Sequence, residues 1–488
     1  IASPGVAMRR QLVAVVWVAL VGALLVPAPA RAVASYTFVG HGYGHGRGMS
    51  QYGAQGAALR GLSAQQILNF YYPGTQASTV GGQIRVQLSA DTDGDTNVAH
   101  TTGLRVHWLS DGVVTPLPQA ARWRLRAVGA QTTLESSNGS GWAGYLTRGG
   151  IAEFQAAAPI TLRTSAGDRT YRGNLRQIGG DTINVLGLDS YLQGVVAREM
   201  PASWRPAALQ SQAIAARTYA VRLRQLNTSR SYDICDTTSC QVYGGLADEA
   251  TATNTAIAAT SGQIRTYQGA PALTQYASSS GGHTVSGGVP YLPAQADPYD
   301  GFAGNPVHSW SRTITPGTLA QAFPGIGEIL AITVTSRSGG GEWGGRAARV
   351  QVRGTRGNAS VTGATVRSRL GLRSDWFAIG GQVEISGAAA QINAAYRALG
   401  GKKRLSRARG PVRLVSVGAF RAYRKGRIYW SPDTGAVVLR GRILRAYLRR
   451  GGPIGYLGFP ATSPRRVARG WTATFEHGSL VISSRRVG

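Results

Sequence analysis

The sequence is poor in acidic residues, cysteine and methionine. Only 22 of its 488 residues are Asp or Glu, against 52 Lys or Arg, and there are 2 Cys and 3 Met. The net charge of +30 favours a polyanionic partner, such as nucleic acid, anionic lipid or an acidic wall polymer. The length favours two or three domains, and the 67 glycines favour loops, turns and sheet over long helices.

Long apolar runs are absent except near the N-terminus. A basic segment at residues 8–10 precedes an apolar segment at residues 11–26, and small-x-small sites end at Ala30 and Ala34. This pattern predicts an export signal over residues 1–34, with an uncleaved membrane anchor as the alternative. No other run approaches the ~20 apolar residues that a membrane helix needs. We therefore expect a secreted, wall-associated protein, which makes nucleic acid an unsuitable partner despite the charge.

The two cysteines, Cys235 and Cys240, lie close together in the sequence. In an exported chain such a pair most simply forms a disulfide that closes a small loop. A structural zinc site is the alternative, but four ligands are usual and no His lies nearby. We predict the disulfide, with no metal and no cofactor.

Residues 188–220 contain a pair of helical patterns separated by Pro201. Four residues share one face of the first helix, spaced i, i+3, i+4 and i+7 after a cap at Asp189: Leu192, Val195, Val196 and Glu199. A carboxyl group held against apolar surface has its pKa raised from about 4.3 towards roughly 6–7, the range of a general acid. The alternative is a mixed face on which Glu199 caps a solvated turn.

The second helical pattern begins near Pro206, a favoured residue in a first turn, and is very rich in alanine. Gln212 and Tyr219 share a face of this helix. Arg217 is a long side chain with several hydrogen-bond donors in an otherwise apolar stretch. The alternative to a role in binding is a salt bridge or a surface position.

Two Gly-rich polar stretches, residues 40–56 and 274–288, could form the walls of a binding groove. The first contains His45, Ser50, Gln51 and Tyr52, and the second contains Ser279. An isolated Gly-rich turn with incidental polar residues is the alternative. A metal role for the histidines of the first stretch lacks a third ligand.

The C-terminal tail has a different composition from the rest of the chain. Residues 394–488 hold 21 Lys or Arg and 2 Asp or Glu. The Gly/Ala-rich residues 379–390 are interpreted as a hinge to this tail. Upstream, residues 84–183 show short alternating runs separated by turn residues, which predict strands.

Three of these stretches together resemble the SpoIID/LytB family, the stage II sporulation protein D type of peptidoglycan lytic transglycosylases and amidase enhancers. The helix pair resembles its main motif through YLQGVVAREMPASW and ALQSQAIAARTYA. The glycine-rich stretches resemble its other motifs through GHGYGHGRGMSQYGAQGAA and QYASSSGGHT. In the sporulation proteins the SQYGA motif closes the domain, whereas here it opens it. This arrangement resembles a circular permutation, so we expect Tyr36–Val39 to lie near Asp375–Ile379.

The resemblance implies that Glu199 is the catalytic residue and that Arg217 and Tyr52 help to bind or orient glycan. We expect the remaining groove residues to be Gln212, Gln51, Ser50, His45 and Ser279. The tail resembles the LGFP repeats of actinobacterial envelope proteins through IYWSP and LGFP, although its first repeat lacks an LGFP sequence. That resemblance implies anchoring in the wall.

We therefore predict an α+β fold, with a β-rich catalytic domain over residues 35–385 that includes a few packed helices, and a small basic repeat region over residues 386–488. The leading functional hypothesis is a lytic transglycosylase that cleaves the MurNAc-β-1,4-GlcNAc bond of peptidoglycan strands. The alternative is a non-catalytic wall-binding protein or amidase enhancer. Further expected partners are an anionic or arabinogalactan-type wall polymer, bound through the tail, and a wall amidase.

Overall fold

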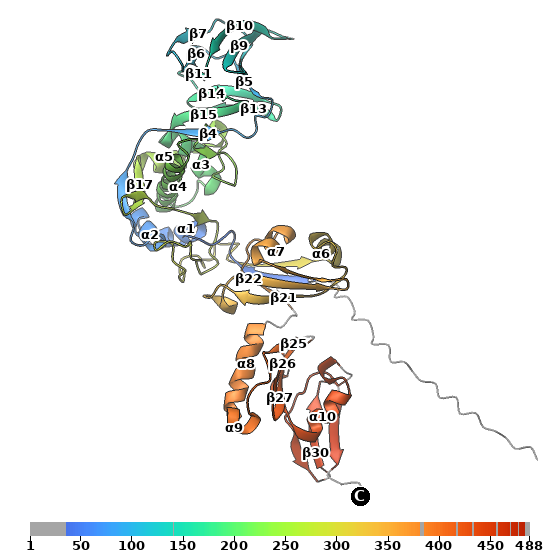
Figure 1. The fold of residues 1–488 in the computed structure, drawn as a ribbon. Coiled ribbons are helices and arrows are strands. Elements are labelled where there is room, and N and C mark those ends of the chain that lie inside the picture. Colours follow the sequence, from blue (N-terminus) through green and yellow to red (C-terminus); the bar gives the residue numbers. More distant parts are fainter. Residues whose placement is uncertain are drawn as a thin grey trace, which may run out of the picture.

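The computed structural model describes residues 36–139, 141–380, 385–415, 418–431, 434–454, 457–468, 470–476 and 478–483. The predicted export signal lies outside these residues. Within them, helices and strands are mixed throughout, which confirms the predicted α+β class (Figure 1). None of the helices in the described part of the chain is both long and apolar enough to cross a membrane.

Residues 83–187 form a two-sheet lobe, to which the short strand β16 is added from residues 234–235. One sheet has the strand order β10-β9-β8-β5-β12-β13 and the other β16-β4-β15-β14-β11-β6-β7. Their strands alternate buried and exposed side chains, as expected for sheets with one face on a core. The bounds are β4 (Gln83–Gln87), β5 (Asp95–Ala99), β6 (Arg105–Trp108), β7 (Val114–Pro116), β8 (Arg122–Val128), β9 (Gln131–Ser137), β10 (Ala143–Gly149), β11 (Ala152–Gln155), β12 (Ile160–Thr164), β13 (Gly167–Tyr171), β14 (Asn174–Ile178), β15 (Asp181–Gly187) and β16 (Ile234–Cys235).

Residues 49–79 and 188–308 form a helical lobe next to the two-sheet lobe (Figure 1). Its central helix α4 begins at Pro206 as predicted, and its buried alanines let α1, α3 and α5 pack closely against it. The bounds are β2 (Met49–Ser50), α1 (Gln51–Leu59), α2 (Ala64–Tyr71), β3 (Gln76–Thr79), α3 (Leu188–Glu199), α4 (Pro206–Leu226), a 3-10 turn (Leu246–Asp248), α5 (Thr251–Ala259), β17 (Gln263–Tyr267), β18 (Ala270–Pro271) and β19 (Tyr276–Ala277).

The start of α3 differs from the prediction. Its N-cap is Gly187, which has no side chain to cap the helix, and Asp189 lies inside the first turn. Asp189 is instead held by Arg217 of α4, at 2.7 Å between Nη2 and Oδ1. The carboxylate therefore ties two helices together and does not cap one.

Residues 36–41 and 309–380 form a third lobe with its own hydrophobic core. Strand β1 lies between β20 and β24 in one sheet, and β21-β22-β23 form another. The bounds are β1 (Tyr36–His41), β20 (Ser309–Ile314), α6 (Pro316–Ala322), β21 (Ile329–Arg337), a 3-10 turn (Glu342–Gly344), β22 (Ala347–Gly354), β23 (Asn358–Val361), α7 (Gly363–Leu370) and β24 (Phe377–Gly380).

The predicted proximity of the two ends of this lobe is confirmed. Phe38 of β1 pairs with Ile379 of β24, and the ladder extends over four residues of β1. The circular permutation that motivated the expectation remains a prediction. The described part of the single domain predicted over residues 35–385 contains three hydrophobic clusters: one shared by the two-sheet and helical lobes, one within the helical lobe and one within the third lobe.

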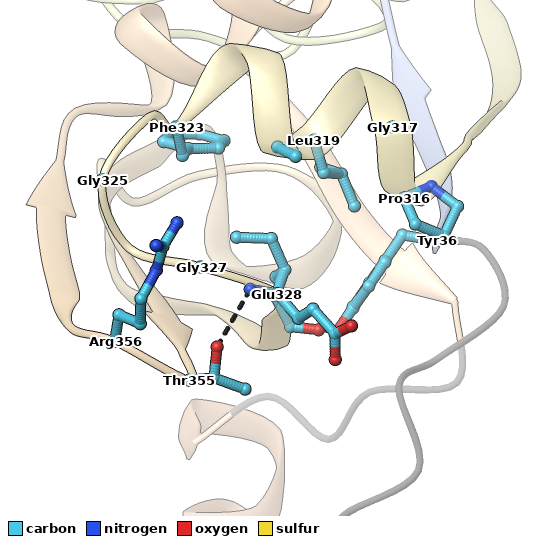
Figure 2. A pocket seen from close by; sticks show the side chains of 12 residues that line it. Tyr36, Pro316, Gly317, Leu319, Phe323, Gly325, Gly327, Glu328, Thr355 and Arg356 are labelled. Carbon is cyan, nitrogen blue, oxygen red and sulfur yellow. Dashed lines mark hydrogen bonds between the residues drawn. The ribbon is translucent and has the colours of Figure 1, made fainter.

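A cavity of about 610 Å³ lies in the third lobe. Helix α6 forms one wall, through Leu319 and Phe323 at its end, and Tyr36 and the loop before β21 form another (Figure 2). The Glu328 N–H donates to Thr355 Oγ1 across the cavity rim at 3.1 Å.

The basic C-terminal region contains two antiparallel sheets, β25-β26-β27-β28 and β29-β30-β31. Residues 379–390 were interpreted as a hinge, and for residues 385–390 this is wrong. Helix α8 begins at Ile385 and packs on the first of these sheets. The bounds are α8 (Ile385–Ala398), α9 (Gly401–Leu405), β25 (Arg413–Val415), β26 (Gly418–Tyr423), β27 (Gly426–Ser431), β28 (Gly435–Leu439), α10 (Gly441–Arg449), a 3-10 turn (Gly452–Ile454), β29 (Arg465–Val467), β30 (Gly470–Phe475) and β31 (Gly478–Ser483).

Candidate active site

Glu199 is the last residue of α3 and lies at the end of the buried face of this helix. The apolar positions predicted from the helical period, Leu192, Val195 and Val196, are fully buried in the core shared by the two-sheet and helical lobes. The helix ends here because Met200, the residue before Pro201, is driven out of helical geometry and is extended. The carboxyl group therefore stands where the apolar core meets the half-buried surface.

Two neutral donors from distant segments hold the Glu199 carboxyl group. Gln51 Nε2 donates to Glu199 Oε2 at 2.9 Å, and the Tyr276 hydroxyl also hydrogen-bonds this carboxyl group. The two donors meet because β2 and β19 pair in parallel. Tyr276 lies in β19, and Gln51 directly follows β2. Gln51 was predicted to line the site, whereas Tyr276 was not singled out.

A chain of hydrogen bonds orients the Tyr276 hydroxyl. Gln241 Nε2 donates to the Tyr276 oxygen at 2.7 Å, and the Tyr191 hydroxyl donates to Gln241 Oε1 at 3.2 Å. Because an amide nitrogen can only donate, the Tyr276 oxygen accepts this bond and its own proton is directed to Glu199. Such chains strengthen each bond by polarisation, so the three side chains fix the orientation of the carboxyl group.

Burial raises the pKa of Glu199, and the hydrogen bonds from Gln51 and Tyr276 counteract this only in part. Burial, and next the nearby Glu199 carboxylate, raise the pKa of Tyr276 well above its usual value, so its hydroxyl keeps its proton. The carboxyl group thus holds a proton at higher pH than a free glutamate does. Once it has lost that proton, two donors are in place to stabilise the carboxylate.

An aromatic cluster begins at the residue that follows Gln51. The Tyr52 ring contacts Trp204 with 4.9 Å between ring centroids, and Phe302 lies 6.3 Å from Tyr52. All three rings are only partly buried, and Tyr52 directly follows Gln51. Flat apolar faces of this kind suit the faces of sugar rings, and the role predicted for Tyr52 stays a prediction. Trp204 and Phe302 were missed.

Ser50 and Ser279 do not face a groove. Both are buried and both donate to the carboxylate of Asp300, Ser50 at 2.6 Å and Ser279 at 2.8–2.9 Å. Ser50 Oγ also accepts from the Gly53 N–H and so caps α1. These positions are a correction to the expected substrate contacts, because the hydroxyl groups are used to hold the two Gly-rich stretches together.

Arg217 also has a different role from the one expected. Its side chain is 0% exposed, and it donates to Asp189, to the Gln263 carbonyl at 3.0 Å and to the Ile257 carbonyl at 3.4 Å. A guanidinium group that is enclosed by α3, α5 and β17 cannot reach a glycan strand. We therefore correct its assignment to a tie between these elements.

Replacing Arg217 by methionine is expected to lower the free energy of unfolding by about 2–4 kcal/mol, since two carbonyl groups and Asp189 each lose a charged donor. Urea-induced unfolding measures this loss. The control is Arg198→Met on α3, where an exposed arginine pairs with Asp248 and little change is expected. A raised KM for glycan with unchanged stability would instead restore a role in binding.

Gln212 and His45 make no hydrogen bond to the Glu199 network among the described residues. Gln212 is fully buried on α4, and neither of its amide atoms has a hydrogen-bond partner among the described residues. His45 accepts from the Arg47 N–H at 3.0 Å, and burial, with the positive charges of Arg47 and Arg346, lowers its pKa to about 4. The surroundings of His45 are therefore the border with the third lobe, which corrects its expected groove contact, whereas the role expected for Gln212 stays a prediction.

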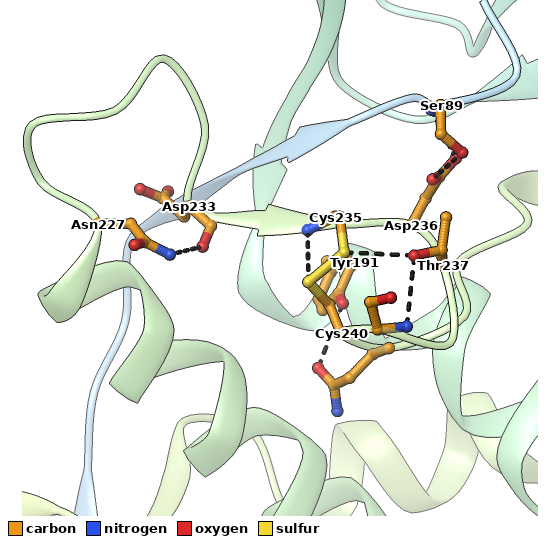
Figure 3. Close-up of a disulfide and its surroundings, with 10 residues drawn as sticks. Ser89, Tyr191, Asn227, Asp233, Cys235, Asp236, Thr237 and Cys240 are labelled. Atoms are coloured by element: carbon orange, nitrogen blue, oxygen red, sulfur yellow. Dashed lines mark hydrogen bonds between the residues drawn. A yellow bond between two sulfur atoms is a disulfide. The ribbon is translucent and has the colours of Figure 1, made fainter. Parts of the chain in front are cut away.

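The cysteine pair is bonded in the structure, as predicted (Figure 3). The bond closes the loop that ends directly before Gln241, and Tyr191 lies beside it in Figure 3. The disulfide therefore fixes the segment from which Gln241 reaches both tyrosines. Gln241 was missed by sequence reasoning, and its position next to Cys240 is the one signal that could have found it.

Neither a metal centre nor the cavity of Figure 2 belongs to this site. In the residues that the structure describes, no group of three or more His, Cys, Asp or Glu is placed to hold a metal ion. The cavity is lined only by residues of the third lobe, and none of them contacts Glu199. The candidate site is thus the Glu199 network with the aromatic cluster.

Comparisons with known proteins locate two families in the chain. The stage II sporulation protein (SpoIID) family matches residues 177–267, which include α3, α4, Gln241 and Glu199. The LGFP repeat matches residues 411–455.

Three curated relatives are similar to the chain. It is 38% identical over 130 residues to the amidase enhancer of Bacillus subtilis (strain 168), covering 25% of this chain and 17% of the relative. It is 28% identical over 270 residues to the stage II sporulation protein D of Bacillus amyloliquefaciens, covering 50% of this chain and 74% of the relative. The corresponding protein of Bacillus subtilis (strain 168) is 27% identical over 252 residues, covering 46% and 71%.

Proposed function

We propose, from the premise that the chain carries a SpoIID domain at residues 177–267 and an LGFP repeat at residues 411–455, that it is a peptidoglycan lytic transglycosylase. A cell-wall-related function follows from the two families and from the amidase-enhancer and sporulation relatives. The finer proposal is that Glu199 is the general acid that cleaves the MurNAc-β-1,4-GlcNAc bond. The observation that carries it is the position of this one carboxyl group: Glu199 lies inside the matched segment and at the end of a buried helix face, it accepts a hydrogen bond from Gln51, and burial raises its pKa.

The proposed reaction needs one carboxyl group in two successive roles. Protonated Glu199 gives its proton to the glycosidic oxygen that leaves with GlcNAc, while the bond to the muramic acid anomeric carbon breaks. The 6-hydroxyl oxygen of the same muramic acid bonds to that carbon, and its proton returns to the Glu199 carboxylate. The product is a 1,6-anhydro end, and no water is consumed. A single acid-base suits this reaction better than the two-carboxylate hydrolases.

The neighbouring side chains support each role. Gln51 and Tyr276 stabilise the carboxylate after it has given its proton, which keeps burial from making Glu199 too weak an acid. Tyr52, which follows Gln51 in the chain, and its neighbours Trp204 and Phe302 offer flat surfaces on which sugar rings can stack.

The test is the product formed from peptidoglycan strands whose stem peptides have been removed. The wild-type protein is expected to release fragments with 1,6-anhydro-muramic ends, identified by mass spectrometry, and the Glu199→Gln variant is expected to release none. Reducing ends in place of anhydro ends would show a hydrolase and contradict the proposal.

A second candidate function is favoured by the 38% identity to an amidase enhancer. On this proposal the protein binds the wall and stimulates an amidase without cleaving glycan. Intact binding to wall sacculi, with no anhydro products and with faster release of peptides by an added amidase, would favour it.

Tyr276→Phe is expected to move the alkaline limb of the pH profile of kcat/KM to higher pH. The hydroxyl lowers the pKa of Glu199, so its removal lets that pKa rise further and keeps the acid protonated at higher pH. The maximal rate is expected to fall by about tenfold, the equivalent of one hydrogen bond to a charged group. The control is Tyr219→Phe, which removes a partly buried hydroxyl of α4 outside the network. Equal profiles for both variants would show that Tyr276 only supports the fold.

A further inference from the structure

A second cavity, of about 580 Å³, lies along β20 and is not part of the Glu199 network. The loop at Tyr43 and the end of α7 enclose it from two sides. Its lining consists of Tyr43, Pro306, Val307, Ser309, Trp310, Ser311, Arg312, Gly371 and Arg373. We call this cavity the β20 groove.

The β20 groove is positively charged. Two arginines line it, and no acidic residue does. Arg373 Nη1 donates to the Pro306 carbonyl at 3.3 Å, and Arg312 Nη1 donates to the Gly371 carbonyl. Each contact uses one nitrogen of a group that has five N–H donors, so both guanidinium groups are positioned and retain donors for an anion. A carboxylate is the group that a guanidinium binds with two parallel hydrogen bonds.

The backbone of β20 offers a second kind of contact. β20 is the end strand of its sheet, paired only with β1 in the described chain. Because the Gly42 N–H donates to the His308 carbonyl at 3.0 Å, the next pair, His41 and Ser309, is a non-hydrogen-bonded one. The N–H and C=O groups of Ser309 and Ser311 therefore point away from β1, where an extended peptide can add as a further strand.

Tyr43 completes the groove from the Gly-rich stretch. Its side chain is 45% exposed, and the chain is anchored on both sides of the ring. The Tyr43 N–H donates to the Ser279 carbonyl at 2.9 Å, and the Gly44 N–H donates to the Arg373 carbonyl at 3.0 Å. Gly44 has φ +104°, and an added Cβ there would lie 2.8 Å from Ala277 Cβ, so this approach requires glycine.

We propose that the β20 groove binds a short, extended peptide that carries carboxylates, with its backbone along β20 and a carboxylate on Arg312 and Arg373. Peptidoglycan stem peptides and protein C-termini share this chemistry. We assign the groove to the stem peptide, and this assignment to the wall polymer rests on the proposed function. Ser279, which holds Tyr43, donates to Asp300, and so does Ser50, which caps the helix of Gln51. The groove and Glu199 are therefore built on one loop framework.

Binding is measured by isothermal titration calorimetry at low salt, with the full chain carrying Glu199→Gln so that cleavage cannot interfere. The probes are a disaccharide-tetrapeptide from peptidoglycan, the free tetrapeptide, the peptide-free disaccharide, and an L-peptide of equal length and charge. We expect the first two to bind, the disaccharide-tetrapeptide more tightly. Equal affinity of the L-peptide would overturn the assignment to the stem peptide, and failure of the free tetrapeptide to bind would overturn the peptide site itself.

Two pairs of variants locate the site. Arg312→Gln with Arg373→Gln is expected to weaken tetrapeptide binding about tenfold or more, whereas Arg349→Gln with Arg353→Gln, on exposed positions of β22, removes the same charge without effect. Ser311→Pro deletes the outward N–H of an edge strand that tolerates proline, and is expected to weaken binding several-fold. Ser311→Ala keeps the N–H and is expected to bind normally. Equal effects within either pair would contradict the proposal, and these results do not depend on whether Glu199 cleaves glycan.

Discussion

Replacing Glu199 by glutamine is expected to lower the rate of glycan cleavage by about 10²–10⁴-fold, the contribution typical of a general acid-base group. Glutamine has nearly the same shape and can still accept a hydrogen bond from Gln51 or Tyr276, so the fold and the substrate surface are expected to be unchanged. What is lost is the proton that must reach the leaving oxygen. The measurement is kcat on purified strands, with KM and the thermal unfolding temperature determined in parallel.

The pH dependence of cleavage by the wild-type protein tests the same assignment. On the proposed mechanism Glu199 must be protonated to act, and burial raises its pKa, so cleavage is expected to decline with rising pH at a value above that of a free glutamate. The residual activity of Glu199→Gln is expected to lack this limb. Full activity of the folded variant, or a limb that survives in it, would place the acid elsewhere.

Replacing Asp300 by alanine is expected to destabilise the helical lobe by more than about 4 kcal/mol. The Asp300 carboxylate is 0% exposed and accepts hydrogen bonds from side chains and from backbone N–H groups. Its donors are the side chains of Ser50, Ser279, Asn305 and His308 and the N–H groups of Ser280 and Gly281. Alanine would leave all of them buried or partly buried without this acceptor.

Urea-induced unfolding measures the loss, and hydrogen exchange at residues 279–281 shows whether it is centred there. Asp300→Asn keeps one acceptor oxygen and is expected to be milder, so a folded protein remains available for comparison. Asp168→Ala, which breaks an exposed pair with Arg163, is the control, and no measurable change is expected. A stability of Asp300→Ala equal to that of the control would contradict the role of this carboxylate.

The ion pair between Asp300 and His308 contributes stability only within a limited pH range. Burial raises the pKa of Asp300, but hydrogen bonds from His308, Ser50 and Ser279 outweigh it and hold that pKa below its usual value. The Asp300 contribution is therefore present above about pH 4 and is lost as pH falls through the lowered pKa. The hydrogen bond to Asp300 raises the pKa of His308, whose contribution is complete below about pH 6.5 and is lost as pH rises through the raised value. The pair thus stabilises most between about pH 4 and 6.5.

The helical period was enough to predict the environment of Glu199. Spacing placed Leu192, Val195 and Val196 on one face, and a face of that kind has to be buried whatever the rest of the chain does. The same reasoning could not assign Arg217, since a long donor in an apolar stretch can reach either a solvent groove or a buried partner. Its partner Asp189 lies 28 residues earlier, and their meeting depends on how two helices cross.

The positions of Gln241 and Tyr276 in the site could not be derived from local sequence patterns. Gln241 and Tyr276 belong to different segments, and neither lies in a periodic run that fixes the direction of its side chain. The parallel pairing of two-residue strands brings Tyr276 beside Gln51, and such short strands leave almost no signal in sequence. The pairing of the ends of the third lobe was predictable because it followed from motif order, which depends on topology and not on side-chain detail.

The position of β1 has a consequence for when the protein can fold. The first described strand is the middle strand of a sheet whose other two strands lie about 270 and 340 residues further along the chain. Contacts of such long sequence separation form slowly, since the intervening chain must be closed into a loop first. The sheet is completed only after residue 380 has been synthesised. The loop from β1 to Gln51 is held at its β1 end by this sheet, so that end of the loop is fixed at the same moment. The site is therefore assembled late, after most of the chain is available.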